Sequence, residues 1–216
     1  MPHVLDQPGS LLPVTQRFLA AAGRHVVVDL GPDDATCLAR LAVVFGEADP
    51  GVVTNLRRIQ ERYSGLAYQS AFFSEDVFFQ PVLEPDPGDT AVEFLYAVHP
   101  TTASCAGAAL RPDGTVLVGW EDQEVAAFPS LDHLLNCDAL LAWRAGLPRA
   151  VLPTADSSTV ISEPRFTRID AASGYTSEWF FDREVLIHVC STWNAIWAGG
   201  ESVVRTWALD GRDPLG

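Results

Sequence analysis

The stretch that decides the fold is LRPDGTVLVGWEDQEVAAFPSLDHLLNCDALLAWRAG, residues Leu110–Gly146. Its Pro112-Asp113-Gly114 tripeptide predicts a tight turn between two apolar runs, because Pro presets φ, Asp bonds its own downstream backbone and Gly accepts a positive φ. The apolar run Val116–Trp120 is typical of a strand covered on both faces. Ser130 predicts the N-cap of an amphipathic helix, and Gly146 predicts its end. The buried stripe of that helix is expected at Leu131, Leu134, Leu135, Cys137, Leu141 and Trp143.

The same signals organise the chain on either side of this stretch. Upstream, apolar spacing and cap residues predict helices over 11–22, 33–45 and 52–65. Aromatic and β-branched runs predict strands over His25–Leu30, 71–82 and 91–98. Downstream, 151–209 consists of short β-type runs separated by Ser, Gly, Asp and Pro, and four of the six tryptophans lie between Trp179 and Trp207. The second half of the chain is therefore predicted to be rich in β structure.

The charge balance excludes several classes of function. The 216 residues include 28 acidic and 14 basic side chains, and every basic one is Arg, with no Lys at all. Mechanisms that need a lysine amine are therefore excluded, including Schiff bases, P-loops and Ser-Lys nucleophile pairs. A formal charge of -14 disfavours nucleic acid as a partner and favours a basic protein. Solubility alone is the other explanation of this acidity.

The ends and the cysteines bear on the compartment. The first ten residues have neither the basic nor the apolar region of a secretory signal. The uncharged stretches Phe94–Leu110 and Val185–Gly200 are too short to cross a bilayer, which needs about 20 residues. The four cysteines have no CxxC spacing, which favours free thiols over disulfides. We expect a cytoplasmic, soluble protein that does not bind membranes.

Few residues offer chemistry. His188 with Cys190, and His133 with Cys137, could each supply half of a zinc site, but neither pair comes with the partner spacing of a complete one. No G-x-S-x-G elbow occurs, so an atypical hydrolytic site around His188 or His99 is only an alternative. We therefore predict no catalytic residue, no metal and no cofactor.

The strongest binding signal is a set of acidic residues accompanied by aromatics near predicted strand ends. Aromatic side chains ringed by charge are typical of interface hot spots, although an ordinary solvated edge looks the same in sequence. The predicted partner-binding residues are Tyr68, Glu75, Asp76, Glu84, Asp86, Asp89, Trp120, Glu121, Asp122 and Glu124.

Three segments together resemble the SUKH superfamily. They are the helix end RIQERYSGL at 58–66, the hairpin PDGTV at 112–116 and the helix start AFPSLDHLL at 127–135. The family shows an aromatic-x-Gly helix end, a D-G-x-V hairpin and an S-F-x-x-L-L helix. In this chain Ser64 stands where the family often has Asn or Gly, and Leu131 replaces an aromatic residue. The resemblance covers about 52–146.

The resemblance implies an α+β domain and, for bacterial members, immunity proteins of polymorphic toxin systems. With the element pattern above, we expect a single domain over 1–216 with a mostly antiparallel sheet, helices packed on one side and a β-rich C-terminal extension over 151–216. The implied function is non-catalytic binding of a cognate toxin, which is often itself basic. The second hypothesis is a scaffold or regulatory protein of the same fold. The oligomeric state is left open.

Overall fold

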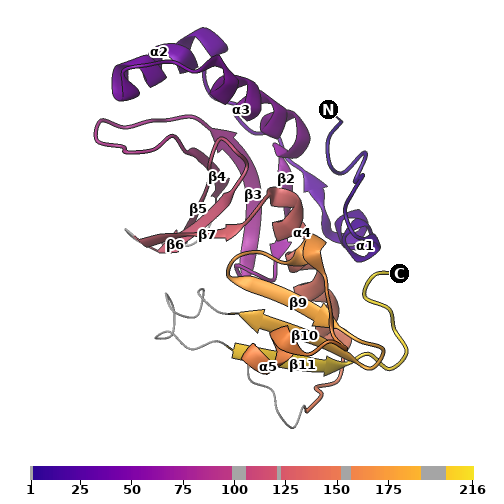
Figure 1. Cartoon of the computed structure of the whole chain (residues 1–216). Helices are drawn as coiled ribbons and strands as arrows, with labels where there is room; N and C mark the ends of the chain where they lie inside the picture. Colours follow the sequence, from indigo (N-terminus) through magenta and orange to yellow (C-terminus); the bar gives the residue numbers. More distant parts are fainter. Residues whose placement is uncertain (1, 99–105, 121–122, 152–156, 191–202) are drawn as a thin grey trace.

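The computed structural model describes residues 2–98, 106–120, 123–151, 157–190 and 203–216, which form an α+β fold with two antiparallel sheets (Figure 1). The larger sheet has the order β1-β2-β3-β4-β5-β6-β7, so each strand pairs with its neighbour in sequence. Its strands are β1 (Arg24–His25), β2 (Leu66–Ser70), β3 (Glu75–Val82), β4 (Phe94–Val98), β5 (Ala106–Leu110), β6 (Val116–Trp120) and β7 (Gln123–Phe128). The antiparallel pairing of β5 with β6 confirms the turn predicted at Pro112-Asp113-Gly114.

The structure confirms the three helices predicted upstream of the hairpin. They are α1 (Pro13–Ala22), α2 (Asp34–Phe45) and α3 (Pro50–Tyr63). The helices downstream of the hairpin are α4 (Leu131–Trp143) and α5 (Ser157–Ser162). Asp33 caps α2 by accepting a bond from the Thr36 amide at 2.8 Å, and Gly46 ends this helix in the left-handed conformation. In α3 the apolar stripe of Val53, Leu56 and Ile59 is buried, as expected for an amphipathic helix.

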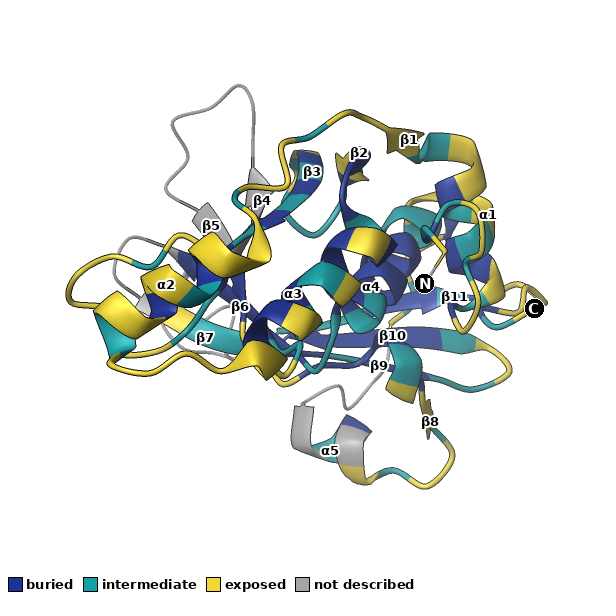
Figure 2. Ribbon diagram, turned by 90° about the horizontal axis from the view of Figure 1, so that it is seen from above, coloured by how far each residue is buried: buried dark blue, intermediate teal, exposed yellow. Residues whose placement is uncertain are grey.

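Helix α4 is the centre of the molecule, and it is not amphipathic. Its buried residues include every position from Leu134 to Leu141, and Figure 2 shows it dark blue among the other elements. On one side Asp138 bonds Tyr68 of β2, and on the other Trp179 donates its indole N–H to Cys137 at 3.3 Å. The expected single stripe was wrong because α4 packs between elements from both halves of the chain, and a helix covered on all sides is buried all round.

The C-terminal part confirms the predicted β-rich extension. It contains the four-stranded sheet β11-β10-β9-β8, formed by β8 (Thr167–Arg168), β9 (Ser177–Phe181), β10 (Val185–Cys190) and β11 (Val203–Ala208). The 3₁₀ turns η1 (Arg144–Gly146) and η2 (Asp170–Ala172) lead into and through this part. The Tyr175 amide donates to the Ala127 carbonyl of β7 at 2.8 Å, and Gly174 leaves room for this approach because a Cβ there would lie 2.1 Å from the same oxygen. One hydrophobic cluster joins Tyr68 and Phe79 of the large sheet to Trp179 and Trp207 of the small one.

Local predictions failed at four places. The run STVIS at 158–162 was expected among the short β-type runs of 151–209, but it belongs to helix α5. Only Arg24 and His25 form a strand where His25–Leu30 was expected, and Val27 is fully exposed. The run 71–82 is a strand only from Glu75, because a turn containing Ser74 at φ 61 precedes it. Ser130 occupies the N-cap of α4, but its hydroxyl pairs with His133 Nδ1 at 2.8 Å instead of bonding a helix amide. Within the described ranges, no helix is both long and apolar enough to cross a membrane.

Candidate functional site

A groove between α2 and the loop after β3 brings acidic and apolar side chains together. It has a volume of about 530 Å3 and is bounded by α2 on one side and by residues 84–87 on the other. Val43 of α2 is 83% exposed here, and Glu84 and Asp86 lie opposite. Figure 2 shows α2 as one of the most exposed elements of the fold. We call this site the α2 groove; its lining residues are Thr36, Ala39, Arg40, Val43, Val44, Glu84, Pro85, Asp86 and Pro87.

The acidic wall of the α2 groove is held by its own chain. Pro85 and Pro87 restrict φ on either side of Asp86. The Asp86 amide donates to Asp89 Oδ2 at 2.8 Å, and the Asp89 amide donates to the Asp86 carbonyl at 3.1 Å. A turn fixed in this way presents its exposed carboxylates with little entropy left to lose on binding.

A second acidic feature lies where β4 begins. Burial raises the pKa of Glu93, and the neighbouring Glu124 raises it further through its charge and a side-chain hydrogen bond. Asp89 adds to the repulsion, while Arg111 opposes it. Asp89 and Glu124, which were predicted as binding residues, therefore both act on Glu93, which was not. Asp89 and Glu124 are 35 positions apart in the sequence.

Asp86 is joined to Asp89 by hydrogen bonds, whereas Glu75 and Asp76 do not join this group. Glu75 and Asp76 begin β3, whereas Glu84 and Asp86 follow its other end. An eight-residue strand spans roughly 25 Å at about 3.3 Å per residue, so the two sets lie at opposite edges of the sheet. Asp76 instead lies 4.0 Å from Arg24. The predicted acidic rim is thus divided between the two ends of β3.

Two further predictions concern aromatic residues. Tyr68 was expected at the binding surface, but it is fully buried, because its hydroxyl bonds Asp138 and its ring packs against Phe18 and Phe79. Trp120 ends β6, where it pairs with Gln123. Its side chain, like Glu121, Asp122 and His99, lies outside the described residues.

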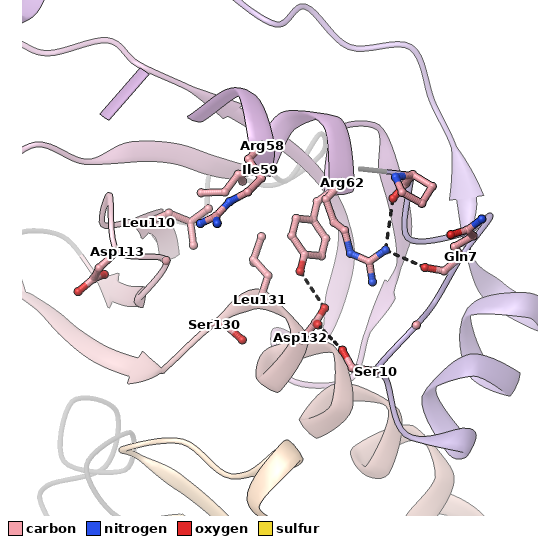
Figure 3. A pocket seen from close by; sticks show the side chains of 14 residues that line it. Gln7, Ser10, Arg58, Ile59, Arg62, Leu110, Asp113, Ser130, Leu131 and Asp132 are labelled. Atoms are coloured by element: carbon pink, nitrogen blue, oxygen red, sulfur yellow. Dashed lines mark hydrogen bonds between the residues drawn. The ribbon is translucent and has the colours of Figure 1, made fainter. Parts of the chain in front are cut away.

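A separate cavity of about 510 Å3 lies between the ends of α3 and α4 (Figure 3). All three segments that carry the family resemblance contribute to it, through Tyr63, Asp113 and Asp132 among others. Tyr63 donates to Asp132 Oδ1 at 2.8 Å, and burial and this carboxylate raise the pKa of Tyr63. Asp132 also accepts a bond from Ser10. The motifs of the resemblance thus shape one cavity of the fold.

The N-terminal segment forms one wall of this cavity. The buried Arg62 guanidinium donates to the carbonyls of Gln7 at 2.7 Å, Pro8 at 3.2 Å and Pro2 at 3.3 Å. The Val4 amide in turn donates to the Arg62 carbonyl at 2.9 Å. Figure 3 shows Arg62 turned toward this segment and Arg58 turned toward Leu110. Arg62 therefore has a structural role at this wall.

His188 and Cys137, one residue from each histidine and cysteine pair, lie next to Ser177 in the core. Ser177 Oγ lies 2.7 Å from His188 Nε2 and 3.4 Å from Cys137 Sγ, which resembles a nucleophile and base. Burial lowers the pKa of His188 to about 3 and raises that of Cys137 to about 12, so both groups are neutral near pH 7. No carboxylate orients the ring, since His188 Nδ1 has no partner among the described residues. Nor do three or more His, Cys, Asp or Glu side chains gather anywhere in the described part of the chain in a way that could hold a metal ion.

Sequence reasoning missed three residues of these sites. The sequence did not indicate that Val43 is exposed, because an apolar residue in an amphipathic helix is expected to be buried. Glu93 lay inside a predicted strand, and it meets Glu124 of β7, which lies three strands away from β4 in the sheet. Asp138 carried a usable signal, since a charged residue within LLNCDALL must be paired if the helix is buried.

Comparison of the chain with protein-family models, with curated proteins and with solved structures finds no match.

Proposed function

We propose that this chain is a non-catalytic protein-binding module, an immunity protein that neutralises a cognate basic toxin of a bacterial polymorphic toxin system, and that the α2 groove is its binding face. The observation that carries the proposal is the pairing of an exposed apolar residue, Val43, with the exposed carboxylates of Glu84 and Asp86 across one groove. An apolar centre with a charged rim is the anatomy of a specific interface.

The charge of the chain supports the same partner class. A formal charge of -14 accelerates encounter with a cationic protein and repels nucleic acid. Asp89, Glu93 and Glu124 concentrate negative charge near the groove loop, where the pKa of Glu93 is raised first by burial and then by the repulsion of Glu124, which Arg111 partly offsets. A basic surface that covers these groups would relieve this repulsion, which is a gain that electrically neutral partners cannot offer.

The first experiment identifies the partner. The chain is used as bait in a lysate of its native host and is co-expressed with the product of the adjacent upstream gene. A stoichiometric complex with that product, together with restored growth of cells that express it, supports the hypothesis of an immunity protein. A complex with a harmless partner would favour the scaffold or regulatory reading, and the absence of any complex would remove the support for a binding module.

The second experiment locates the interface. Asp86→Arg changes the charge at the groove, and Asp76→Arg makes the same change at the other end of β3. We expect Asp86→Arg to slow association with the partner about tenfold at low salt, and Asp76→Arg to change it less than twofold. Val43→Asp should chiefly raise the dissociation rate, because it places a carboxylate in the apolar centre. Equal effects of the two Asp→Arg changes would contradict this placement of the binding face.

A further inference from the structure

Three arginines gather on the small sheet, in a protein whose acidic residues outnumber its basic ones two to one. The guanidinium carbons of Arg144 and Arg149 lie 4.8 and 4.9 Å from the centroid of the Trp207 ring. Arg205 is on β11, two residues before Trp207, and side chains two apart on a strand share one face. We call these residues, Arg144, Arg149 and Arg205, the arginine triad.

Backbone pairing explains how residues so distant in sequence meet. The segment 148–150 lies alongside β11: the Ala208 amide donates to the Pro148 carbonyl at 2.9 Å, and the Ala150 amide donates to the Thr206 carbonyl at 3.1 Å. Arg149 thereby stands directly opposite Trp207 in an antiparallel bridge, so the two side chains share a face. Arg144 reaches the same ring from the C-terminal end of α4.

The arginine triad has no counter-ion in the described part of the chain. The ion pairs there involve Arg24, Arg57 and Arg168. Arg144 and Arg205 are half-buried, and Arg144 Nε is shielded from solvent without a hydrogen-bond partner. Three like charges held close together oppose folding, since partial burial strengthens their repulsion, and no described acidic side chain offsets them.

The neighbouring groups show the effect of this positive charge. Burial lowers the pKa of Arg144, and Arg205 and Arg149 lower it further. His188 is the cross-strand partner of Arg205, and after burial it is Arg205 and Arg144 that most depress its pKa. Among the residues that the structure describes, no acidic side chain contributes to either of these two shifts.

We propose that the arginine triad is a binding site for a small phosphoryl dianion, either inorganic phosphate or a compact phosphate monoester. Guanidinium groups whose faces lie on an indole keep their N–H edges free for the paired bonds that phosphate oxygens accept. A phosphoryl group carries about 1.5 to 2 negative charges at pH 7, whereas a single carboxylate would offset only one of the three positive charges. A polymeric nucleic acid is excluded, because the rest of the surface would repel it.

The site is independent of the proposed binding function, and so is its test. Inorganic phosphate and methyl phosphate are titrated into the full chain by calorimetry at constant ionic strength, with acetate for comparison. We expect saturable binding of one phosphoryl anion per chain, at least tenfold tighter than acetate. The indole N–H signal of Trp207, assigned with Trp207→Phe, should shift over the same titration. The tighter of the two phosphates then identifies the free anion or the monoester as the natural ligand.

Variants separate a built site from non-specific attraction. Arg144→Gln, Arg149→Gln and Arg205→Gln should each weaken phosphate binding at least tenfold and should remain folded, because each removes a repulsion. Arg165→Gln is the matched control, since Arg165 also lies over an aromatic ring, that of Phe166 at 4.5 Å, but on its own. Equal loss in the control, equal affinity for acetate, or no saturable binding of either phosphate would overturn the proposal.

Discussion

Tyr68 of β2 donates a hydrogen bond of 2.9 Å to Oδ2 of Asp138 in α4, although the two residues are 70 positions apart. The same carboxylate accepts bonds from Ser70 Oγ at 2.6 Å and from the amides of Ala71 and Phe72 at 2.6 and 2.8 Å. Asp138 is fully buried, and these four bonds fix the end of β2 and the turn that follows it on the central helix.

Removal of the tyrosine hydroxyl should measure this contact. We expect Tyr68→Phe to lower the free energy of unfolding by about 2 kcal/mol, because a hydrogen bond to a charged group contributes about 1.5 to 3 kcal/mol. Urea denaturation at pH 7 gives the value. Tyr175→Phe is the control, since Tyr175 is 56% exposed, and it should change stability by less than about 0.5 kcal/mol. A Tyr68→Phe variant as stable as this control would show that the bond contributes nothing.

The pH dependence of stability should reveal the titration of the Asp138 carboxyl group. Burial raises its pKa to about 6 against an ordinary value of 3.8, and its four hydrogen bonds limit the rise. Between pH 4 and 6 the folded protein therefore binds more protons than the unfolded chain, so the contribution of Asp138 to stability is present below pH 4 and is lost as pH rises to about 6. Each pKa unit corresponds to about 1.4 kcal/mol.

Asp138→Asn isolates this effect from the other titrating groups. The variant should be less stable than the parent at every pH, because the amide places a donor among donors. The difference between the two proteins should shrink from pH 4 to pH 6 and stay constant above, as followed by urea denaturation at several pH values. A difference that grows over this interval would mean that the pKa of Asp138 is lowered on folding.

Gly65, which ends the Tyr63-Ser64-Gly65 motif, should not tolerate a side chain. Its φ is +80°, and a Cβ there would lie 2.2 Å from the Val26 carbonyl oxygen, so the neighbouring backbone would have to move. We expect Gly65→Ala to destabilise the protein by about 3 kcal/mol or more in thermal or urea unfolding. Gly114→Ala measures the cost of the backbone conformation without a steric clash. The φ of Gly114 is +94°, and no atom lies within 4 Å of a Cβ built there. We therefore expect this substitution to lower the free energy of unfolding by only about 1 to 2 kcal/mol. Equal losses would place the whole effect in the backbone conformation.

Glu124→Gln should relieve the repulsion at Glu93. Because Glu124 helps to raise the pKa of Glu93, ionisation of Glu93 opposes folding as pH rises above its ordinary value of 4.5. We expect the substitution to lower the pKa of Glu93 in an NMR titration and to raise the melting temperature at pH 7 more than at pH 3. Glu47→Gln, at an exposed position after α2, should do neither. An unchanged pKa of Glu93 would show that the two carboxyl groups do not interact in solution.

Much of the local structure could be predicted from the sequence, for reasons that particular residues show. The positions of α2 and α3 followed from apolar spacing and from the capping Asp33, and the β5–β6 hairpin followed from Pro112-Asp113-Gly114. The strand expected at His25–Leu30 failed because β propensity describes a side chain that fits a half-buried surface, and no strand covers Val27.

The candidate sites were predicted only in part. Glu84 and Asp86 were identified as partner-binding candidates, and they do line a groove, but Val43 completes that groove from a helix, 41 positions before Glu84. Tyr68 was placed at the surface, because a tyrosine next to acidic residues looks the same in sequence whether its hydroxyl meets water or a buried carboxylate.

By itself the sequence determined the α+β class, most of the helices and strands before residue 147, the absence of lysine chemistry and the negative charge, because these depend on composition, on periodicity and on contacts within a few residues. The tertiary structure decided which charges meet. It divided the acidic rim between the two ends of β3, buried α4 on every side and brought Arg144, Arg149 and Arg205 together around Trp207. Such encounters depend on strand register and on the direction of each chain crossing, which no local pattern of residues encodes.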